Sequence, residues 1–270
     1  MKIKLTVVAL LFISSLAFGW GHQSHVRITD LALKNLAAES PGLWKNHEKI
    51  SLMAARVDGV KDYRSDEAAR HFLDFENYPE LAVGLPSESD FERLHDLNFI
   101  DRNGNLPYAI EEEYSLLVKS IRSKDFRSAV DNLAFLSHYC EDLYQPLHLT
   151  REYDGRGRQH GLHSKFESAF ADELWPDVEK MKPEPQILIS NLHQTLYEII
   201  KKNRTYLEDI FQSEGKPRRV NDFGRQDRKL REISEGLLQD AIGFVSSMIM
   251  TACREAGAGF PDTLECSSGL

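Results

Sequence analysis

Apolar residues recur at helical spacing along almost the whole chain after residue 19. The first stripe ends just before a turn-forming triplet, Ser40-Pro41-Gly42, and its members are Val26, Ile28, Leu31, Leu33 and Leu36. Three of these residues, Val26, Leu33 and Leu36, are seven and three residues apart, which are spacings that place side chains on one face of a helix. A proline followed by a glycine predicts that this helix ends there. Alternating patterns, which would indicate strands, are scarce, so the chain is predicted to be all-α.

Three further helices are indicated along the chain. Pro107 occupies a position typical of a first helical turn, ahead of apolar residues at Ile110, Tyr114, Leu117 and Ile121. Two late stripes follow, at Leu188, Leu192, Leu196, Ile199 and Ile200, and at Ile233, Leu237, Ala241, Val245 and Met248. We expect a single helical-bundle domain over 20–270. Its loops are expected near 76–88, 98–107, 150–162 and 214–225.

The N-terminal segment has the pattern of a secretory signal peptide. Lys2 and Lys4 precede a mostly apolar run over 5–18, with small residues before a cleavage point after Gly19. The run is too short to span a membrane comfortably. We therefore expect 1–19 to be removed and 20–270 to be secreted or periplasmic. No second apolar run of about 18 residues is apparent in the sequence.

Composition narrows the functional class. With 33 basic and 42 acidic residues the formal charge is −9, and it becomes −11 once Lys2 and Lys4 are removed. An acidic surface argues against non-specific binding to nucleic acid.

Three cysteines, Cys140, Cys253 and Cys266, allow at most one disulfide; whether Cys253 and Cys266 pair with each other is open. The basic stretch 215–232 is either a solvated loop and helix face or a patch for anions.

The densest chemical signal lies in LAFLSHYCEDLYQPLH (133–148). His138 and Asp142 are four residues apart, so on a helix both project from one face and can bind one ion. Pro146 ends or bends that helix, which lets His148 approach from another direction. Cys140 points to a different face and is expected to be a core thiol. Alone, such a histidine–aspartate pair is more often a surface hydrogen bond.

A second cluster repeats this spacing. In HGLHSKFESAF (160–170), His163 and Glu167 again stand four residues apart. Upstream, Asp58 and His71 lie in a stretch that is rich in carboxylates. Imidazole and carboxylate are the ligands of zinc in water-activating sites, and repeated pairs of this kind build metal centres inside helical bundles.

Nine residues together form an ordered pattern: Trp20, His25, Asp58, His71, His138, Asp142, His148, His163 and Glu167. Through this pattern the chain resembles the superfamily of bacterial zinc-dependent phospholipases C and the related zinc nucleases that cut single strands. The resemblance covers most of 20–270 and is sharpest in WGHQSH (20–25), HYCEDLYQPLH (138–148) and HGLHSKFE (160–167). HSKFE is closer to the phospholipase branch, whereas the short gap from Trp20 to His25 is closer to the nucleases.

The resemblance implies an all-α fold with three zinc ions in a cleft. Asp58, His71, His138 and Asp142 would hold one zinc, and His148, His163 and Glu167 a second. The amine and carbonyl of Trp20, with His25 and a bridging Asp142, would hold the third. The free amine of Trp20 exists only after cleavage behind Gly19, so processing would complete the site.

The implied reaction is phosphodiester hydrolysis by metal-activated hydroxide, with Asp58 as a base or orienting group. The expected substrate is a phospholipid at a membrane surface. A short nucleic acid, cut by a single-strand nuclease or 3′-nucleotidase, is the alternative. A third possibility is an exported zinc-binding protein without catalysis. No protein partner is implied, and we expect a monomer.

The headgroup of such a phospholipid is left open. Relatives that hydrolyse phosphatidylcholine carry aromatic residues where this chain has Gly59 and Ala68, so a cation–π choline box is not supported at these positions. Nearby aromatic residues could serve instead: Tyr63, Phe72, Phe75 and Tyr78. The remaining histidines match nothing in the pattern, and they are His22, His47, His95, His160 and His193.

Overall fold

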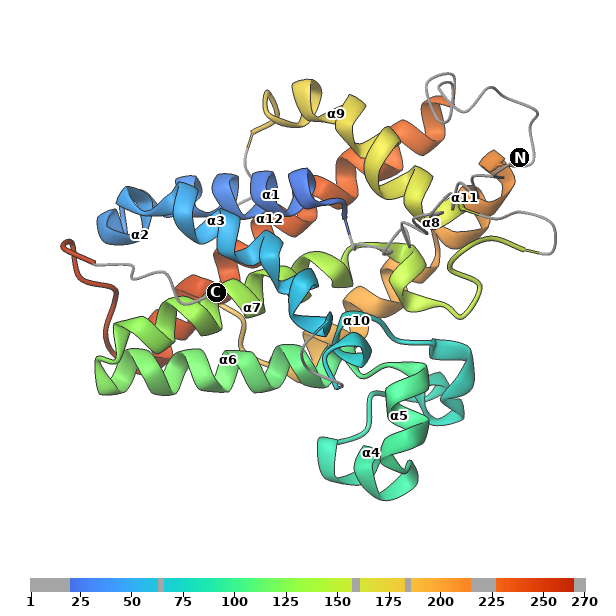
Figure 1. The fold of residues 1–270 in the computed structure, drawn as a ribbon, viewed down its shortest axis with the longest axis horizontal. Coiled ribbons are helices and arrows are strands. Elements are labelled where there is room, and N and C mark those ends of the chain that lie inside the picture. Colours follow the sequence, from blue (N-terminus) through green and yellow to red (C-terminus); the bar gives the residue numbers. More distant parts are fainter. Residues whose placement is uncertain (1–19, 63–65, 157–160, 183–185, 215–226, 265–270) are drawn as a thin grey trace, which may run out of the picture.

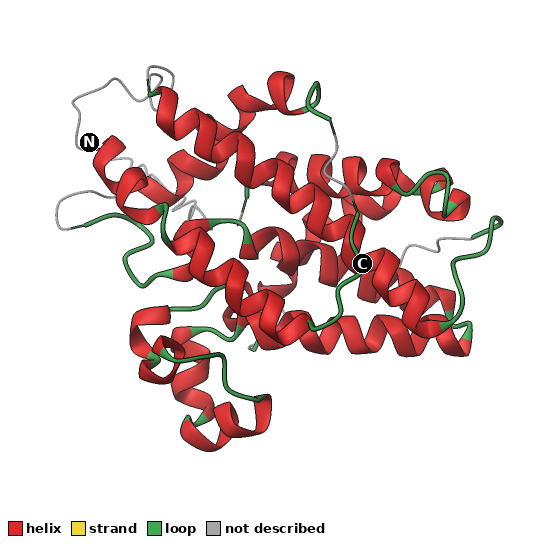
Figure 2. Cartoon of the chain, turned by 180° about the vertical axis from the view of Figure 1, so that it is seen from behind, coloured by secondary structure: helices red, strands yellow, loops and turns green. Residues whose placement is uncertain are grey.

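The computed structural model describes residues 20–62, 66–156, 161–182, 186–214 and 227–264, and every regular element in these ranges is helical (Figures 1 and 2). The all-α prediction is confirmed. The α-helices are α1 (His22–Asn35), α2 (Pro41–Lys45), α3 (His47–Arg56), α4 (Glu88–Leu94), α5 (Leu97–Asn103), α6 (Leu106–Ser123), α7 (Phe126–Leu143), α8 (Leu162–Ser164), α9 (Ala171–Val178), α10 (Leu192–Arg204), α11 (Leu207–Glu214) and α12 (Arg228–Ala256).

Short helical turns connect these elements. The 3₁₀ turns are η1 (Val57–Asp62), η2 (Ala68–His71), η3 (Phe75–Asn77), η4 (Pro79–Ala82) and η5 (Pro146–Leu149), and a π-helical turn, η6 (Lys165–Phe170), joins α8 to α9. The central bundle consists of α1, α3, α6, α7 and α12: α6 packs along α7, α1 packs along α3, and α12 contacts α1, α6 and α7. Helices α4 and α5 form a lobe at one end of this bundle (Figure 1).

A tight reversal fixes the α6–α7 hairpin. Pro107 lies in the first turn of α6, as predicted, and Lys124 ends that helix in the left-handed conformation with φ of 60°. Asp125 then caps α7, because its carboxylate accepts a hydrogen bond from the Ser128 amide at 3.2 Å. Two residues thus turn the chain back, so that α6 and α7 run side by side in opposite directions.

The segment 136–150 is buried at every position, although it runs from the middle of α7 through η5. An ordinary surface helix shows an apolar face and a polar face, and here both faces are covered. Neighbours on its several sides include α3, α6 and α12. Cys140 is fully buried in this segment with a free thiol, as expected for a core residue.

Helix α12 is long and apolar enough to meet the length and composition criteria for a membrane span, and two-thirds of its most apolar stretch is buried inside the protein. The expectation that no such stretch follows the leader is therefore wrong for α12. Its predicted stripe is confirmed, since Leu237, Ala241, Val245 and Met248 are buried against the bundle. Contacts with α1, α6, α7 and α9 identify it as a core helix.

Several predicted boundaries are wrong. Helix α1 ends at Asn35, because the amides of the next two residues bond back to Leu33 and Lys34, and Pro41 opens α2 instead of ending α1. Leu188 precedes α10 and is exposed. The segment 98–107 is mostly helical rather than a loop.

Capping explains that last error. The Asp96 carboxylate accepts a hydrogen bond from the Phe99 amide at 2.8 Å, which starts α5, and Gly104 ends it with φ of 81°. The expected loop at 76–88 contains η3, η4 and the first residue of α4. Of the loop expected at 214–225, residues 215–225 lie outside the described residues, as do the proposed leader 1–19, Tyr63, His160 and Cys266.

Gly104 ties the α4–α5 lobe to the segment that carries His71. Its φ of 81° is unfavourable for other residues, and a Cβ there would lie 2.1 Å from the Phe72 carbonyl oxygen. We expect Gly104→Ala to lower the free energy of unfolding by at least about 2 kcal/mol, measured by chemical denaturation.

The matched control for this substitution is Gly236→Ala inside α12, where an added Cβ meets nothing within 4 Å. This substitution should leave the free energy of unfolding unchanged or raise it by up to about 1 kcal/mol, because alanine favours helix interiors. Equal effects of the two substitutions would contradict the role given to Gly104.

Candidate metal centre

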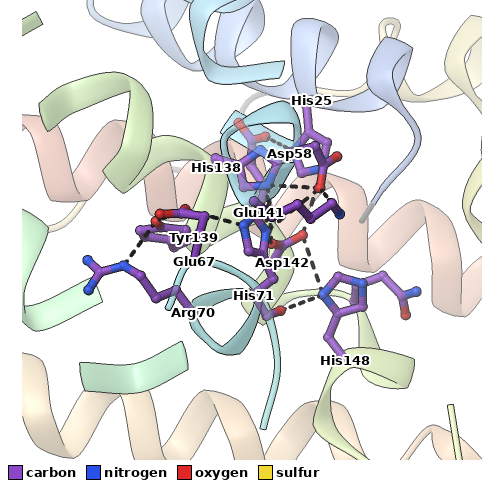
Figure 3. A network of polar contacts seen from close by, with 12 residues as sticks. His25, Asp58, Glu67, Arg70, His71, His138, Tyr139, Glu141, Asp142 and His148 are labelled. Atoms are coloured by element: carbon purple, nitrogen blue, oxygen red, sulfur yellow. Dashed lines mark hydrogen bonds and ion pairs between the residues drawn. The ribbon is translucent and has the colours of Figure 1, made fainter. Parts of the chain in front are cut away.

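Eight of the nine predicted ligands converge in the interior of the bundle, and all eight are buried. They come from seven elements: His25 from α1, Asp58 from η1, His71 from η2, His138 and Asp142 from α7, His148 from η5, His163 from α8 and Glu167 from η6. Figure 3 shows six of these side chains with their polar atoms directed toward one another. Among the described residues, potential ligand atoms form three buried sets: first Asp58, His71 and His138; second His148, His163 and Glu167; and third His25, His138 and Glu141.

Asp142 joins these sets. Its Oδ2 accepts a hydrogen bond from His71 Nδ1 at 3.0 Å and lies 3.3 Å from His138 Nε2. Its Oδ1 lies 3.4 Å from His148 Nδ1 and 3.7 Å from His25 Nε2. One fully buried carboxylate therefore stands among four imidazoles, which is the placement required of a bridging ligand.

The spacing in the first set suits a zinc ion. His138 Nε2 and His71 Nδ1 are 3.0 Å apart, and both are 3.8 Å from Asp58 Oδ1. Ligand atoms about 2.05 Å from a tetrahedral zinc lie roughly 3.3 Å from each other. The observed separations fall on both sides of that value, so these side chains need only small adjustments to share an ion.

The second set converges on one carboxylate oxygen. His163 Nε2 lies 2.5 Å and His148 Nε2 3.1 Å from Glu167 Oε1. The predicted one-turn spacing of His163 and Glu167 holds, although η6 is a π-helical turn. Gln145 fixes the carboxylate by donating to the same oxygen at 2.8 Å.

The third set shows what orients His25. Its Nδ1 bonds to Glu141, whose other oxygen accepts a hydrogen bond from the Thr29 hydroxyl at 2.6 Å. Both Glu141 oxygens are thus engaged, and His25 Nε2 is left facing Asp142. Glu141 therefore orients the His25 ring, in addition to being a potential ligand of this set.

Trp20 lies beside this region. Its side chain is fully buried, and its ring packs against Phe166, next to Glu167, with ring centroids 5.7 Å apart. It precedes α1, the helix that carries His25. No interaction of the Trp20 amine tests its predicted role as a ligand, so that role stays a prediction.

Hydrogen bonds behind the ligands set which ring nitrogen faces the centre. His138 Nδ1 donates to the Ala54 carbonyl at 3.0 Å, and His148 Nδ1 donates to the His71 carbonyl at 2.7 Å. Each therefore presents Nε2. His71 is reversed, since its Nε2 lies 3.4 Å from Glu67 and its Nδ1 faces Asp142. Such outer contacts fix the orientation of metal-binding imidazoles.

A second layer of contacts supports Glu67. The Tyr139 hydroxyl donates a short hydrogen bond to Glu67, and the Arg70 guanidinium donates to that hydroxyl at 3.1 Å. Arg70 also donates to Glu112 at 2.6 Å and to Glu113 at 3.1 Å. This chain connects α6, α7 and η2 behind His71 (Figure 3 shows its Arg70, Tyr139 and Glu67).

The buried atoms without a hydrogen-bond partner among the described residues point to a metal. They include His25 Nε2, Asp58 Oδ2, Asp142 Oδ1 and His163 Nδ1. A buried polar atom without a partner costs about 1–3 kcal/mol, so four such atoms in one site require an explanation. Divalent ions held by nitrogen and oxygen ligands would supply it, and the residues present fit zinc.

The charges of the site are mutually dependent. Burial alone would raise the pKa of Asp142, but His138 and His148 outweigh it and hold that pKa well below its usual range. Burial alone would lower the pKa of His71, but hydrogen bonds to Asp142 and Glu67 raise it to about 9. Burial lowers the pKa of His25 and raises that of Glu141. Carboxylates are thus kept ionised where imidazoles surround them.

The cluster formed by the eight predicted ligands borders a pocket of about 350 Å³. His71, His148 and His163 lie in its wall. Other wall residues are Lys61, Ala68, Phe72, Asp74, Arg102, Leu147, Thr150 and Tyr153. Lys61 donates to Asp58 at 3.1 Å. A larger pocket of about 520 Å³, lined by α1, α9 and α12 residues such as Leu31, Val178 and Gln239, contains none of the predicted ligands.

Sequence reasoning missed Glu67, Glu141 and Gln145. A carboxylate four residues before His71, a second one beside Asp142 and the glutamine before Pro146 were the available signals. The other described histidines lie outside the cluster, as predicted. His22 is exposed, and three more are engaged by carboxylates elsewhere: His47 by Asp30, His95 by Glu80 and His193 by Glu111.

Comparisons with known proteins add no assignment: no family model matches the chain, and no curated protein matches it. The resemblance to zinc phospholipases C and zinc nucleases therefore remains a sequence-based prediction. Independently of that resemblance, the described part of the structure contains three buried groups of histidine and carboxylate side chains that could bind metal ions.

Tyr139→Phe tests the support behind His71. The variant loses the hydroxyl that links Glu67 to Arg70, so His71 should be less well oriented. We expect zinc affinity at this site to fall about 10-fold, measured by competition with a chromophoric chelator.

The matched control is Tyr108→Phe, which also deletes a buried tyrosine hydroxyl but one that donates to the Pro86 carbonyl. Its zinc affinity should stay at the wild-type value. An equal loss in both variants would mean that the Tyr139 effect is a general loss of stability.

Proposed function

We propose that the protein is an exported zinc-dependent phosphodiesterase, and within that class a phospholipase C. The observation that carries the proposal is a set of three buried histidine–carboxylate groups connected by Asp142, one side of which opens on a pocket. A purely structural zinc site would be closed, whereas a catalytic site leaves access for water and substrate. The pocket wall contains His71, His148 and His163, which favours catalysis over zinc storage.

The zinc assignment follows the grouping of the side chains and the predicted pattern. Asp58, His71, His138 and Asp142 would hold one ion, and His148, His163 and Glu167 a second. His25 and Asp142, with the amine and carbonyl of Trp20, would hold a third. Histidine nitrogen and carboxylate oxygen, with no thiolate among these ligands, suit a catalytic zinc site.

Bound zinc would supply Lewis-acid stabilisation of the phosphoryl oxygens and would lower the pKa of water. The side chains of the chain supply orientation. Asp58 Oδ1 is held by Lys61 at 3.1 Å, while its Oδ2 has no hydrogen-bond partner among the described residues. If one Asp58 oxygen binds zinc, the other would be left to accept a proton from the attacking water. Lys61, which lines the pocket, adds positive charge beside it.

A single-strand nuclease or nucleotidase is the second candidate, and one observation favours it. Phe72 and Tyr153 line the pocket together with Lys61 and Arg102, and aromatic rings beside cationic side chains are what a base and its phosphate require. Against it stands the acidic chain, with a formal charge of −9, which does not favour the binding of a long polyanion.

The proposal is tested by metal analysis and parallel assays. Protein processed to Trp20 should contain close to three zinc ions per chain, as the predicted ligand pattern implies, and should hydrolyse phospholipids in preference to single-stranded nucleic acid. Asp58→Asn should reduce hydrolysis by about 10²–10⁴-fold while the helical circular dichroism spectrum is retained.

The control for Asp58→Asn is Asp131→Asn, which makes the same chemical change on the partly exposed face of α7 and should leave activity unchanged. A zinc content near zero in zinc-replete protein would overturn the proposal. If the protein hydrolysed only nucleic acid, the assignment would change from phospholipase to nuclease, and the proposed metal centre would be retained.

The predicted role of Trp20 gives a separate test. If its amine binds zinc, one extra residue before Trp20 should remove the third ion, so that the content falls from about three to about two per chain. The comparison is with the chain that begins at Trp20, measured by elemental analysis of both. An unchanged zinc content would exclude the amine as a ligand and leave the other two groups untouched.

A further inference from the structure

The pocket beside the metal ligands contains one carboxylate that the proposed chemistry does not use. Asp74 lies in the same wall as His71 and His148 and is half-buried. Among the described residues, the Asp74 side chain accepts no hydrogen bond and forms no ion pair, and Arg151 acts on it only at longer range. Burial, with a smaller contribution from Glu76, raises the pKa of Asp74 to about 6, and the positive charge of Arg151 offsets a part of this rise.

Glu76, two residues after Asp74, differs from it in having hydrogen-bond partners within the protein. Glu76 accepts hydrogen bonds from the Arg204 guanidinium at 2.7 Å and the Thr150 hydroxyl at 3.0 Å. Its charge is balanced within the protein, and its pKa is lowered, because the hydrogen bond from Arg204 and the positive charge of that residue, together with backbone hydrogen bonds, outweigh burial. Asp74 has no such internal partner, although it is at least as well shielded from water. A half-buried carboxylate without an internal donor or ion-pair partner is suited to bind a positively charged group of the substrate.

The backbone holds Asp74 in a fixed position relative to the metal ligands. The Asp74 amide donates to the Asn103 carbonyl at 2.7 Å, and the preceding Leu73 amide donates to the His148 carbonyl at 2.8 Å. His148 in turn donates to the His71 carbonyl. Asp74 therefore follows His71 by three residues, on a segment whose backbone is hydrogen-bonded to that of His148.

We propose that Asp74 binds a primary ammonium group on the substrate, so that the preferred phosphodiester is a phospholipid whose headgroup is an amino alcohol such as ethanolamine. This inference rests on the proposed phospholipase function. A primary ammonium brings both a positive charge and N–H donors to an acceptor that has neither. A quaternary ammonium brings charge without donors, so choline satisfies the carboxylate less well.

The other pocket residues agree with this assignment. Phe72 and Tyr153 provide apolar walls for the short carbon chain between phosphate and nitrogen. The Tyr153 ring packs edge-on against His163, with centroids 5.5 Å apart, which places this wall beside the second group of ligands. A scissile phosphate at the metal ligands and an amine at Asp74 would thus occupy one continuous pocket.

The test uses water-soluble short-chain phospholipids that differ only in their headgroup: ethanolamine, choline and glycerol. For the wild-type protein, kcat/KM for the ethanolamine substrate should exceed that for the choline and glycerol substrates by about 10-fold, the value of one charged hydrogen bond. In Asp74→Asn the ethanolamine-to-glycerol ratio should fall by about 10-fold, chiefly through KM, while zinc content stays at the wild-type value.

The matched control is Asp101→Asn on the exposed surface of α5, which removes the same charge at a residue that does not line the pocket. It should keep the wild-type headgroup preference. Equal loss on all headgroups in Asp74→Asn, or a wild-type preference for choline or glycerol, would overturn the inference while phospholipase activity stood. If wild-type protein hydrolysed bis(p-nitrophenyl) phosphate but no phospholipid, the phospholipase assignment and this inference would both be overturned, and the phosphodiesterase class would stand.

Discussion

The rest of the structure depends on the contacts between the buried Asp142 carboxylate and the imidazole rings around it. A charge removed from water is expensive unless other groups balance it, and here four imidazoles from four separate elements do so. To bring these rings together, α1, α7, η2 and η5 must meet at one point. The bundle is therefore organised around a polar centre, with its apolar core packed around that centre.

Much of the fold and of the site could be predicted because both follow local rules. Helical periodicity gave the all-α class, and the i, i+4 spacing correctly paired His138 with Asp142 on α7 and placed His163 near Glu167. Boundaries failed where capping decided them, as at Asp96, whose side chain starts α5 inside a segment expected to be a loop. Single hydrogen bonds of this kind leave little trace in periodicity.

The supporting residues were missed for a different reason. Glu67 and Glu141 matter through contacts made across the fold, to His71 and Tyr139 in one case and to His25 and Thr29 in the other. Thr29 and Glu141 are far apart in sequence, and only tertiary structure makes one the partner of the other. Candidate ligands can be found in the sequence because they are histidines and carboxylates at helical spacing. The residues that orient them can be identified only from their positions in the folded structure.

The burial of residues 136–150 on every side has a consequence for how this protein can change. Most helices keep a solvent face on which substitutions accumulate with little effect, but this segment has none. Each of its residues either packs the bundle or faces the cluster, and several do both. Changes in the pocket that leave the central segment intact are therefore expected on the parts of its wall that η2, α5 and Tyr153 contribute.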